Sequence, residues 1–150
     1  MVNPFDMKAA LTAKHAQHVL LIHFPIASFL AATAFDFLAQ WTKQQSLAVA
    51  SRWNFLLAAV ATVPSTITGV LAWQWQLEGQ RLKGVLLMHL VFGVATSLLL
   101  WIVWLIHHNA QRRPGRDLPL YRLPIETLGI LLVMLTGHLG GFLSGVNGAG

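Results

Sequence analysis

The stretch 84-GVLLMHLVFGVATSLLLWIVWLI-106 contains no Asp, Glu, Lys or Arg and is almost wholly apolar. A helix needs about 20 residues of this kind to cross the hydrocarbon core of a bilayer. Three further runs of similar length and composition lie at about 18–40, 53–77 and 124–145. The sequence therefore predicts four transmembrane helices.

The four predicted spans are joined by short connections, at 41–52, 78–83 and 107–122. Short connections make consecutive helices antiparallel neighbours. We therefore expect an all-α membrane protein, with residues 1–150 forming a single domain that is an up-down-up-down four-transmembrane-helix bundle.

The composition supports a membrane protein and excludes several kinds of site. Apolar residues make up 55% of the chain and charged residues 10%, whereas a soluble domain carries about a quarter charged residues. The chain has no cysteine, which excludes disulfides, thiolate metal sites, iron–sulfur clusters and covalently attached haem. The net charge of +5 comes from short clusters between apolar runs, a pattern that argues against nucleic-acid binding.

The positive residues also predict an orientation, because loops on the cytoplasmic side carry the excess of Lys and Arg. The first and third connections together hold Lys43, Arg52, Arg112, Arg113, Arg116 and Arg122. The N-terminal segment and the second connection hold Lys8, Lys14, Arg81 and Lys83. We therefore expect a multi-pass membrane protein with both termini on the outer side, which for a bacterial inner membrane is the periplasm.

Three histidines lie inside the predicted spans at one depth. His23 is near the start of the first span, His89 near the start of the third, and His138 near the end of the fourth. Each lies roughly 8–9 Å from its boundary at helical rise, on the same side of the bundle. His18 and His15 lie nearer that surface. Ionisable residues within a membrane usually mark a functional site, so we treat these histidines as candidate ligands.

Haem is one cofactor that this arrangement could hold. Low-spin haem iron takes two axial nitrogens, and helix bundles supply them from facing helices. Gly93 lies one turn below His89, where its missing side chain would give clearance for a macrocycle, and Arg81 is placed to meet a propionate. Three histidines could instead bind copper or zinc, and the spacing alone does not separate these cases.

The remaining intramembrane polar residues have structural interpretations. Asp36, near the far end of the first span, is expected to pair with an arginine, Arg52 or Arg122, with a proton path or quinone contact as the alternative. Glu126, in the first turn of the fourth span, is explained by the helix dipole. The adjacent His107 and His108 are expected at the membrane interface.

The chain resembles the bacterial membrane family known as domain of unknown function 2231 along nearly its whole length. The resemblance is carried by 18-HVLLIHFPIA-27, Asp36, 68-TGVLAW-73, 78-EGQRLKGVLLMH-89 and 136-TGHLGGFLSGVNG-148. Family members commonly have His-Pro near the start of the first span, where this chain has His18 followed by Val19.

That family is similar in layout to b-type four-helix membrane cytochromes, with relatives joined to Rieske or cytochrome c domains. The resemblance implies electron transfer near a quinone or a cytochrome, with the family's histidines falling on His18, His23, His89 and His138. Depth favours His89 with His23 or His138 as the axial pair of one haem b, and a second haem would require His18 as well.

The leading hypothesis is therefore an integral membrane haem b protein that passes single electrons as a subunit of, or partner to, a larger redox complex. A cofactor-free accessory subunit and a copper- or zinc-binding membrane protein stay open, as does a homo-oligomer. Independent enzymatic activity is not expected, because the sequence shows no nucleophile–base pair, phosphate-binding loop or paired carboxylates.

Overall fold

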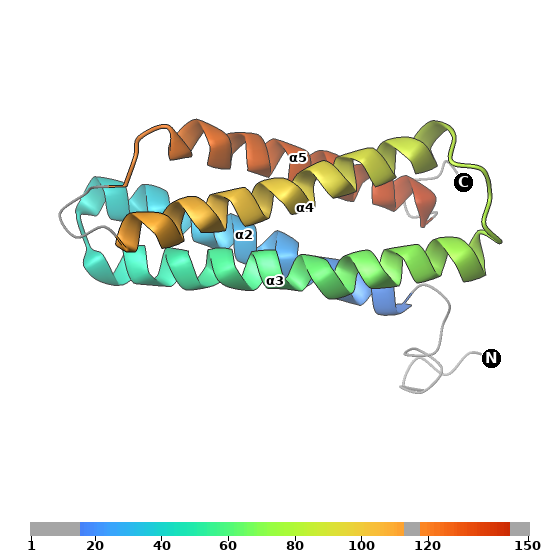
Figure 1. The fold of residues 1–150 in the computed structure, drawn as a ribbon, viewed down its shortest axis with the longest axis horizontal. Helices are drawn as coiled ribbons and strands as arrows, with labels where there is room; N and C mark the ends of the chain where they lie inside the picture. Colours follow the sequence, from blue (N-terminus) through green and yellow to red (C-terminus); the bar gives the residue numbers. More distant parts are fainter. Residues whose placement is uncertain (1–15, 113–117, 145–150) are drawn as a thin grey trace.

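The structure, a computed structural model, describes residues 16–112 and 118–144. It contains four α-helices, which are α2 (Ala16–Thr42), α3 (Gln45–Gln76), α4 (Gly84–Gln111) and α5 (Arg122–Leu143). They run alternately up and down in one bundle (Figure 1), and the described residues include no strand. Each helix is long and apolar enough to span a membrane. The predicted all-α, four-helix membrane fold is confirmed.

The helices extend beyond the predicted spans. α3 begins at Gln45, so most of the connection expected at 41–52 is helical and only Lys43 and Gln44 join α2 to α3. Lys43 adopts a left-handed φ of 58°, which ends α2 and reverses the chain. Hydropathy measures how much of a helix is apolar, and it therefore misses the polar turns that continue a helix past the hydrocarbon.

The bundle consists of two hairpins, because α2 packs mainly against α3 and α4 mainly against α5. We call the end that holds the α2–α3 and α4–α5 connections the Asp36 end, and the opposite end, with the α3–α4 connection, the His18 end. In Figure 1 the Asp36 end is on the left and the His18 end on the right.

The hydrophobic core fills the half of the bundle toward the Asp36 end. The rings of Phe29 and Phe55 lie 5.6 Å apart between centroids and are fully buried. The rest of the core consists of Ala32, Ala58, Leu100, Val103 and Val133. The small alanines let α2 and α3 approach closely, as small residues do between membrane helices.

The half toward the His18 end has no comparable core. Among the described side chains of 17–24, 66–75, 84–95 and 134–143, only Leu139 is buried. Close-packed interiors are the rule in folded proteins. The described side chains of this half are instead half-buried or exposed, with Leu139 as the exception.

A substitution at Gly129 of α5 tests the packing of the core. A Cβ at this position would lie 2.8 Å from Leu99 Cδ2 and 2.7 Å from Phe29 Cε1. Gly129→Ala is expected to destabilise the protein by about 1–3 kcal/mol through overpacking, measured by thermal unfolding in detergent. Gly137→Ala on the same helix is the control, since its Cβ would meet nothing within 4 Å. Equal melting temperatures for the two variants would contradict this packing.

Candidate functional site

His18 and His89 face the interior of the bundle from opposite hairpins. His18 precedes Asp36 on α2, and His89 precedes His107 on α4, in each case by about five helical turns. Residues so separated share one helix face, and Asp36 and His107 are buried. His18 and His89 are themselves half-buried. Both therefore lie on the inner faces of their helices.

A hydrogen bond within its own hairpin orients each of these rings. The Thr68 hydroxyl donates to Pro64 O at 2.9 Å, which leaves Thr68 Oγ1 as the acceptor for His18 Nδ1–H at 3.2 Å. His89 Nδ1–H donates to the carbonyl of Thr136 at 3.1 Å. With Nδ1 as the donor, which the Thr136 carbonyl requires for His89 and the Thr68 contact allows for His18, each Nε2 keeps its lone pair and can act as a metal ligand.

Glycines provide the space in which these rings lie. A Cβ on Gly69 of α3 would come within 3.0 Å of His18 Cε1, and one on Gly140 of α5 within 3.2 Å of His89 Cε1. A larger residue at either position would push the ring out of place. Each imidazole is therefore held by a hydrogen bond on one edge and a glycine against its side.

His18 and His89 belong to different hairpins but lie at the same end of the bundle. Few of the described side chains in this half are buried. Two neutral imidazoles that offer Nε2 are a donor set for a six-coordinate haem iron. The donor chemistry of the described residues fits that group.

The other two candidate ligands, which were expected to pair with His89, are exposed. His23 is exposed, and its Nδ1 bonds to Val19 O of its own helix at 2.6 Å. His138 is exposed and packs edge-on against Phe142, also on its own helix, at 4.9 Å. His23 is turned by about 140° around α2 from His18. His23 and His138 lie at the depth of His89 in the membrane, but their side chains point in other directions around their helices.

The remaining predicted site residues lie at the same end. Gly93 has only the Thr136 methyl within reach of an added Cβ, at 3.9 Å, so its face of α4 has room. Arg81 is exposed in the α3–α4 connection. His15 lies outside the described residues.

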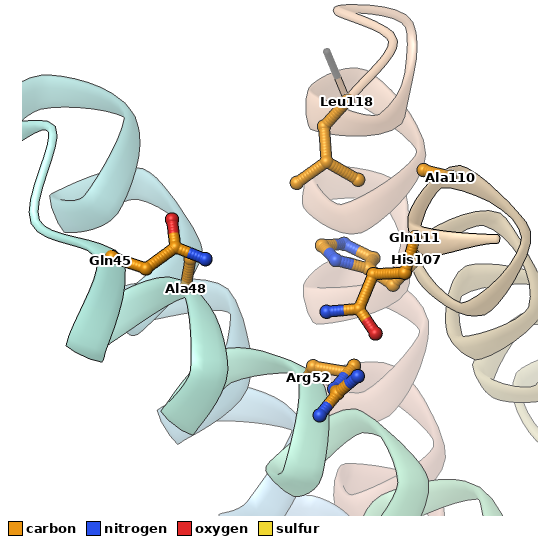
Figure 2. A pocket seen from close by; sticks show the side chains of 7 residues that line it. All are labelled: Gln45, Ala48, Arg52, His107, Ala110, Gln111 and Leu118. Carbon is orange, nitrogen blue, oxygen red and sulfur yellow. The ribbon is translucent and has the colours of Figure 1, made fainter. Parts of the chain in front are cut away.

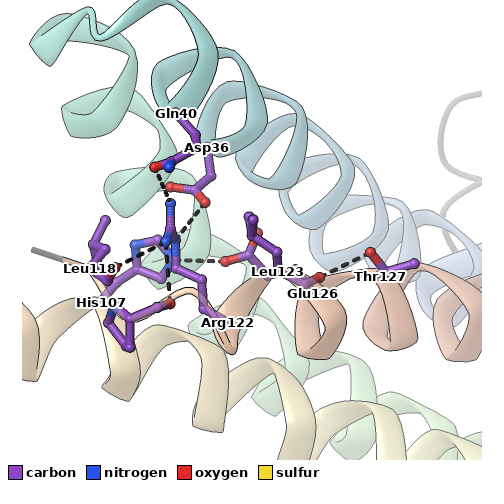
Figure 3. Close-up of polar contacts among 9 residues, drawn as sticks. Asp36, Gln40, His107, Leu118, Arg122, Leu123, Glu126 and Thr127 are labelled. Carbon is purple, nitrogen blue, oxygen red and sulfur yellow. Dashed lines mark hydrogen bonds and ion pairs between the residues drawn. The ribbon is translucent and has the colours of Figure 1, made fainter.

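The Asp36 end contains a buried ion pair between hairpins. Arg122 Nε donates to Asp36 Oδ2 at 2.8 Å, and both side chains are at most 2% exposed. The other guanidinium nitrogens donate to Gln40 Oε1 at 3.2 Å, Pro119 O at 3.2 Å and Leu118 O at 3.3 Å. Figure 3 shows this network. The predicted pairing of Asp36 with an arginine is confirmed, and the partner is Arg122.

A second buried pair was missed in the sequence. His107 Nε2 lies 2.9 Å from Glu126 Oε1, with the two side chains 3% and 0% exposed. His107 is therefore not interfacial, and Glu126 has a partner besides the helix dipole. His108 points elsewhere and stacks on Trp104 with 5.0 Å between ring centroids. His107 shares a helix face with His89, and Glu126 shares one with Arg122. These shared faces are the sequence signal that could have identified the pair.

A cavity of about 250 Å³ adjoins this pair. It is lined by Gln45, Ala48, Arg52, His107, Ala110, Gln111 and Leu118 (Figure 2). Its polar side chains come from the first turns of α3 and the last turns of α4. The buried His107 is thus linked to the Asp36 end of the bundle.

Comparison with known proteins gives one match. A family model described as a predicted membrane protein, DUF2231, matches residues 14–150. No curated protein and no solved structure matches the chain significantly.

Proposed function

The chain belongs to the DUF2231 family of predicted membrane proteins, and from that premise we propose that it binds haem b between its hairpins and passes single electrons. The observation that carries the proposal is the pair His18 and His89. These rings stand on opposite hairpins, both are half-buried, and each has a hydrogen bond at Nδ1 that leaves Nε2 available.

His18 and His89 would hold the haem iron through Nε2. The bonds from Nδ1–H to Thr68 and to the Thr136 carbonyl hold the ring planes and make the nitrogens more basic, as such bonds do for metal-ligating histidines. When bound, haem supplies a reversible one-electron couple. The protein's part is to fix the two ligands on a rigid scaffold and to exclude water with apolar helices.

The low burial of the side chains at the His18 end gives further support. Gly69 and Gly140 lie against the His18 and His89 rings, and an added Cβ on Gly93 would meet one methyl group at 3.9 Å. A flat macrocycle would fill the region in which the described chain has almost no buried side chains. A copper or zinc site of three histidines is less well supported, because His23 and His138 face away from this region.

The site also suggests where the electron partner docks. His18 and His89 lie within the first two turns of α2 and α4, so a haem edge would lie near the membrane surface at the His18 end. Arg81 and Lys83, exposed in the α3–α4 connection, can meet the propionates. With the positive residues setting the orientation, we place this end on the outer side of a bacterial inner membrane, facing another subunit of a redox complex, a cytochrome or a quinone.

Purification in detergent after expression with adequate haem tests the proposal. We expect a Soret band, a pyridine haemochrome spectrum of protoporphyrin IX iron, and iron in proportion to haem and protein. A colourless protein with no iron would refute haem binding. Stoichiometric copper or zinc in its place would favour the metal-site alternative.

A further inference from the structure

The buried groups at the Asp36 end balance in charge only if they hold one proton more than the state with both carboxylates ionised and His107 neutral. The cluster contains two carboxylates, Asp36 and Glu126, and one guanidinium, Arg122, all at most 1% exposed. With His107 neutral, the cluster carries one net negative charge. An uncompensated charge is costly in a low-dielectric interior, so the site favours the uptake of one further positive charge.

Glu126 is the carboxylate whose surroundings favour a proton. Its Oε1 is bonded to His107, whereas its Oε2 is buried and has no hydrogen-bond partner among the residues that the structure describes. A buried polar atom without a partner is uncommon and calls for a physical explanation. A carboxylic acid is cheaper to bury there than a carboxylate.

A proton suits this site better than a metal ion. One ligand atom from each of Asp36, His107 and Glu126 lies within 4.8 Å of the others, which a metal could bridge. However, Arg122 already bonds to Asp36 Oδ2, and a divalent cation would leave the cluster with a net positive charge. One proton makes the cluster neutral.

His107 lies between the acid and the cavity. Its Nε2 meets Glu126, and its ring lines the cavity at the Asp36 end. The charged and titratable groups around the pair are Asp36 on α2, Arg52 on α3 and Arg122 on α5, with Arg52 in the cavity wall.

We propose that Glu126 is a proton-binding site, loaded from the Asp36 end through His107. The proton enters at His107 Nδ1 while the proton on Nε2 moves to Glu126 Oε1. The ring remains neutral in its other tautomer, its Nε2 then accepts the bond from the new acid, and the cluster gains one proton in total. The proposal does not depend on haem.

Infrared spectroscopy can follow Glu126 alone. Glu78 and Glu126 are the two glutamates of the chain, and Glu78 is exposed in the α3–α4 connection at the other end. Protein carrying Glu78→Gln and grown on ¹³C-glutamate therefore has one labelled side chain. In proteoliposomes moved from alkaline to acidic buffer, we expect the labelled carboxylate band to be replaced by a labelled carboxylic-acid band.

Two outcomes of this experiment would overturn the proposal. A labelled carboxylate that never becomes protonated while the protein stays folded would show that no proton is bound. A labelled acid that never loses its proton would show that the group is fixed and exchanges nothing. Because both readings use the native pair at Glu126 and His107, neither depends on a destabilised variant.

The role of His107 is tested by the rate at which the acid exchanges in D₂O. His107→Gln keeps an N–H donor for Glu126 but cannot relay a proton, and exchange is expected to slow by about 100-fold or more. His108→Gln is the matched control, because His108 stacks on Trp104. Equal exchange rates in the two variants would exclude His107 as the route.

Discussion

Alanine in place of His18 or of His89 is expected to abolish stoichiometric haem binding, while alanine in place of His23 or His138 leaves it intact. The reason is direction, since the first two rings lie on inner helix faces and the last two are exposed. A haem iron that loses one of two protein nitrogens loses its six-coordinate low-spin state. The measurement is the haem-to-protein ratio and visible spectrum of each purified variant.

The four substitutions control one another, because each removes one imidazole from a membrane helix. Loss of haem in His23→Ala or His138→Ala, with His18→Ala unaffected, would show that the wrong pair has been assigned. A finer test is Thr68→Val, which keeps the side-chain shape but removes the acceptor for His18 Nδ1. Loss of such a second partner lowers affinity by about 10–100-fold.

Arg122→Met is expected to produce the largest loss of stability. It leaves Asp36, 1% exposed, as a buried carboxylate without its cation, and it also removes the bonds to Gln40, Leu118 and Pro119. Removing one partner of a buried ion pair costs about 3–5 kcal/mol. Thermal or denaturant unfolding in detergent micelles measures the effect.

The double variant Asp36→Leu/Arg122→Met separates the charge from the packing. It removes both ions, and replacing a whole buried pair by apolar residues is often neutral, so it should recover much of the loss. Arg112→Met is the control, an exposed arginine at the same end of the bundle, and should leave stability almost unchanged. A double variant no more stable than Arg122→Met would show that the other bonds of Arg122 dominate.

The sequence was sufficient for the fold, because a membrane restricts a chain of apolar runs to few arrangements. The four spans and their alternation follow from hydropathy and short connections alone. The ends of the helices were harder to predict from the sequence. The first turns of α3 contain polar residues such as Gln45 and Arg52, which made a helix look like a connection.

The site was harder to predict, because hydropathy gives the depth of a residue and not its direction around the helix. His23 and His89 match in depth, yet His23 faces away, and His18 has the interior position. Adjacent residues on a helix point about 100° apart. That difference separates the buried His107 from His108, and a hydropathy profile treats both as equally interfacial.

Register with residues that must be buried is the sequence signal that recovers direction. Asp36 is costly in hydrocarbon and therefore has to face a partner inside the bundle. Counting about five turns back along α2 from Asp36 reaches His18. The same count from His107 reaches His89, but only a structure showing His107 against Glu126 reveals that His107 belongs to the interior.

The most direct test of the account is the electron paramagnetic resonance spectrum of the oxidised, haem-loaded protein. Two imidazole ligands, His18 and His89, predict a low-spin ferric signal that is lost in His18→Ala and in His89→Ala and is kept in His23→Ala and His138→Ala. A high-spin signal in the unmodified protein, or a low-spin signal that survives the loss of His18 and of His89, would contradict a haem held between the two hairpins.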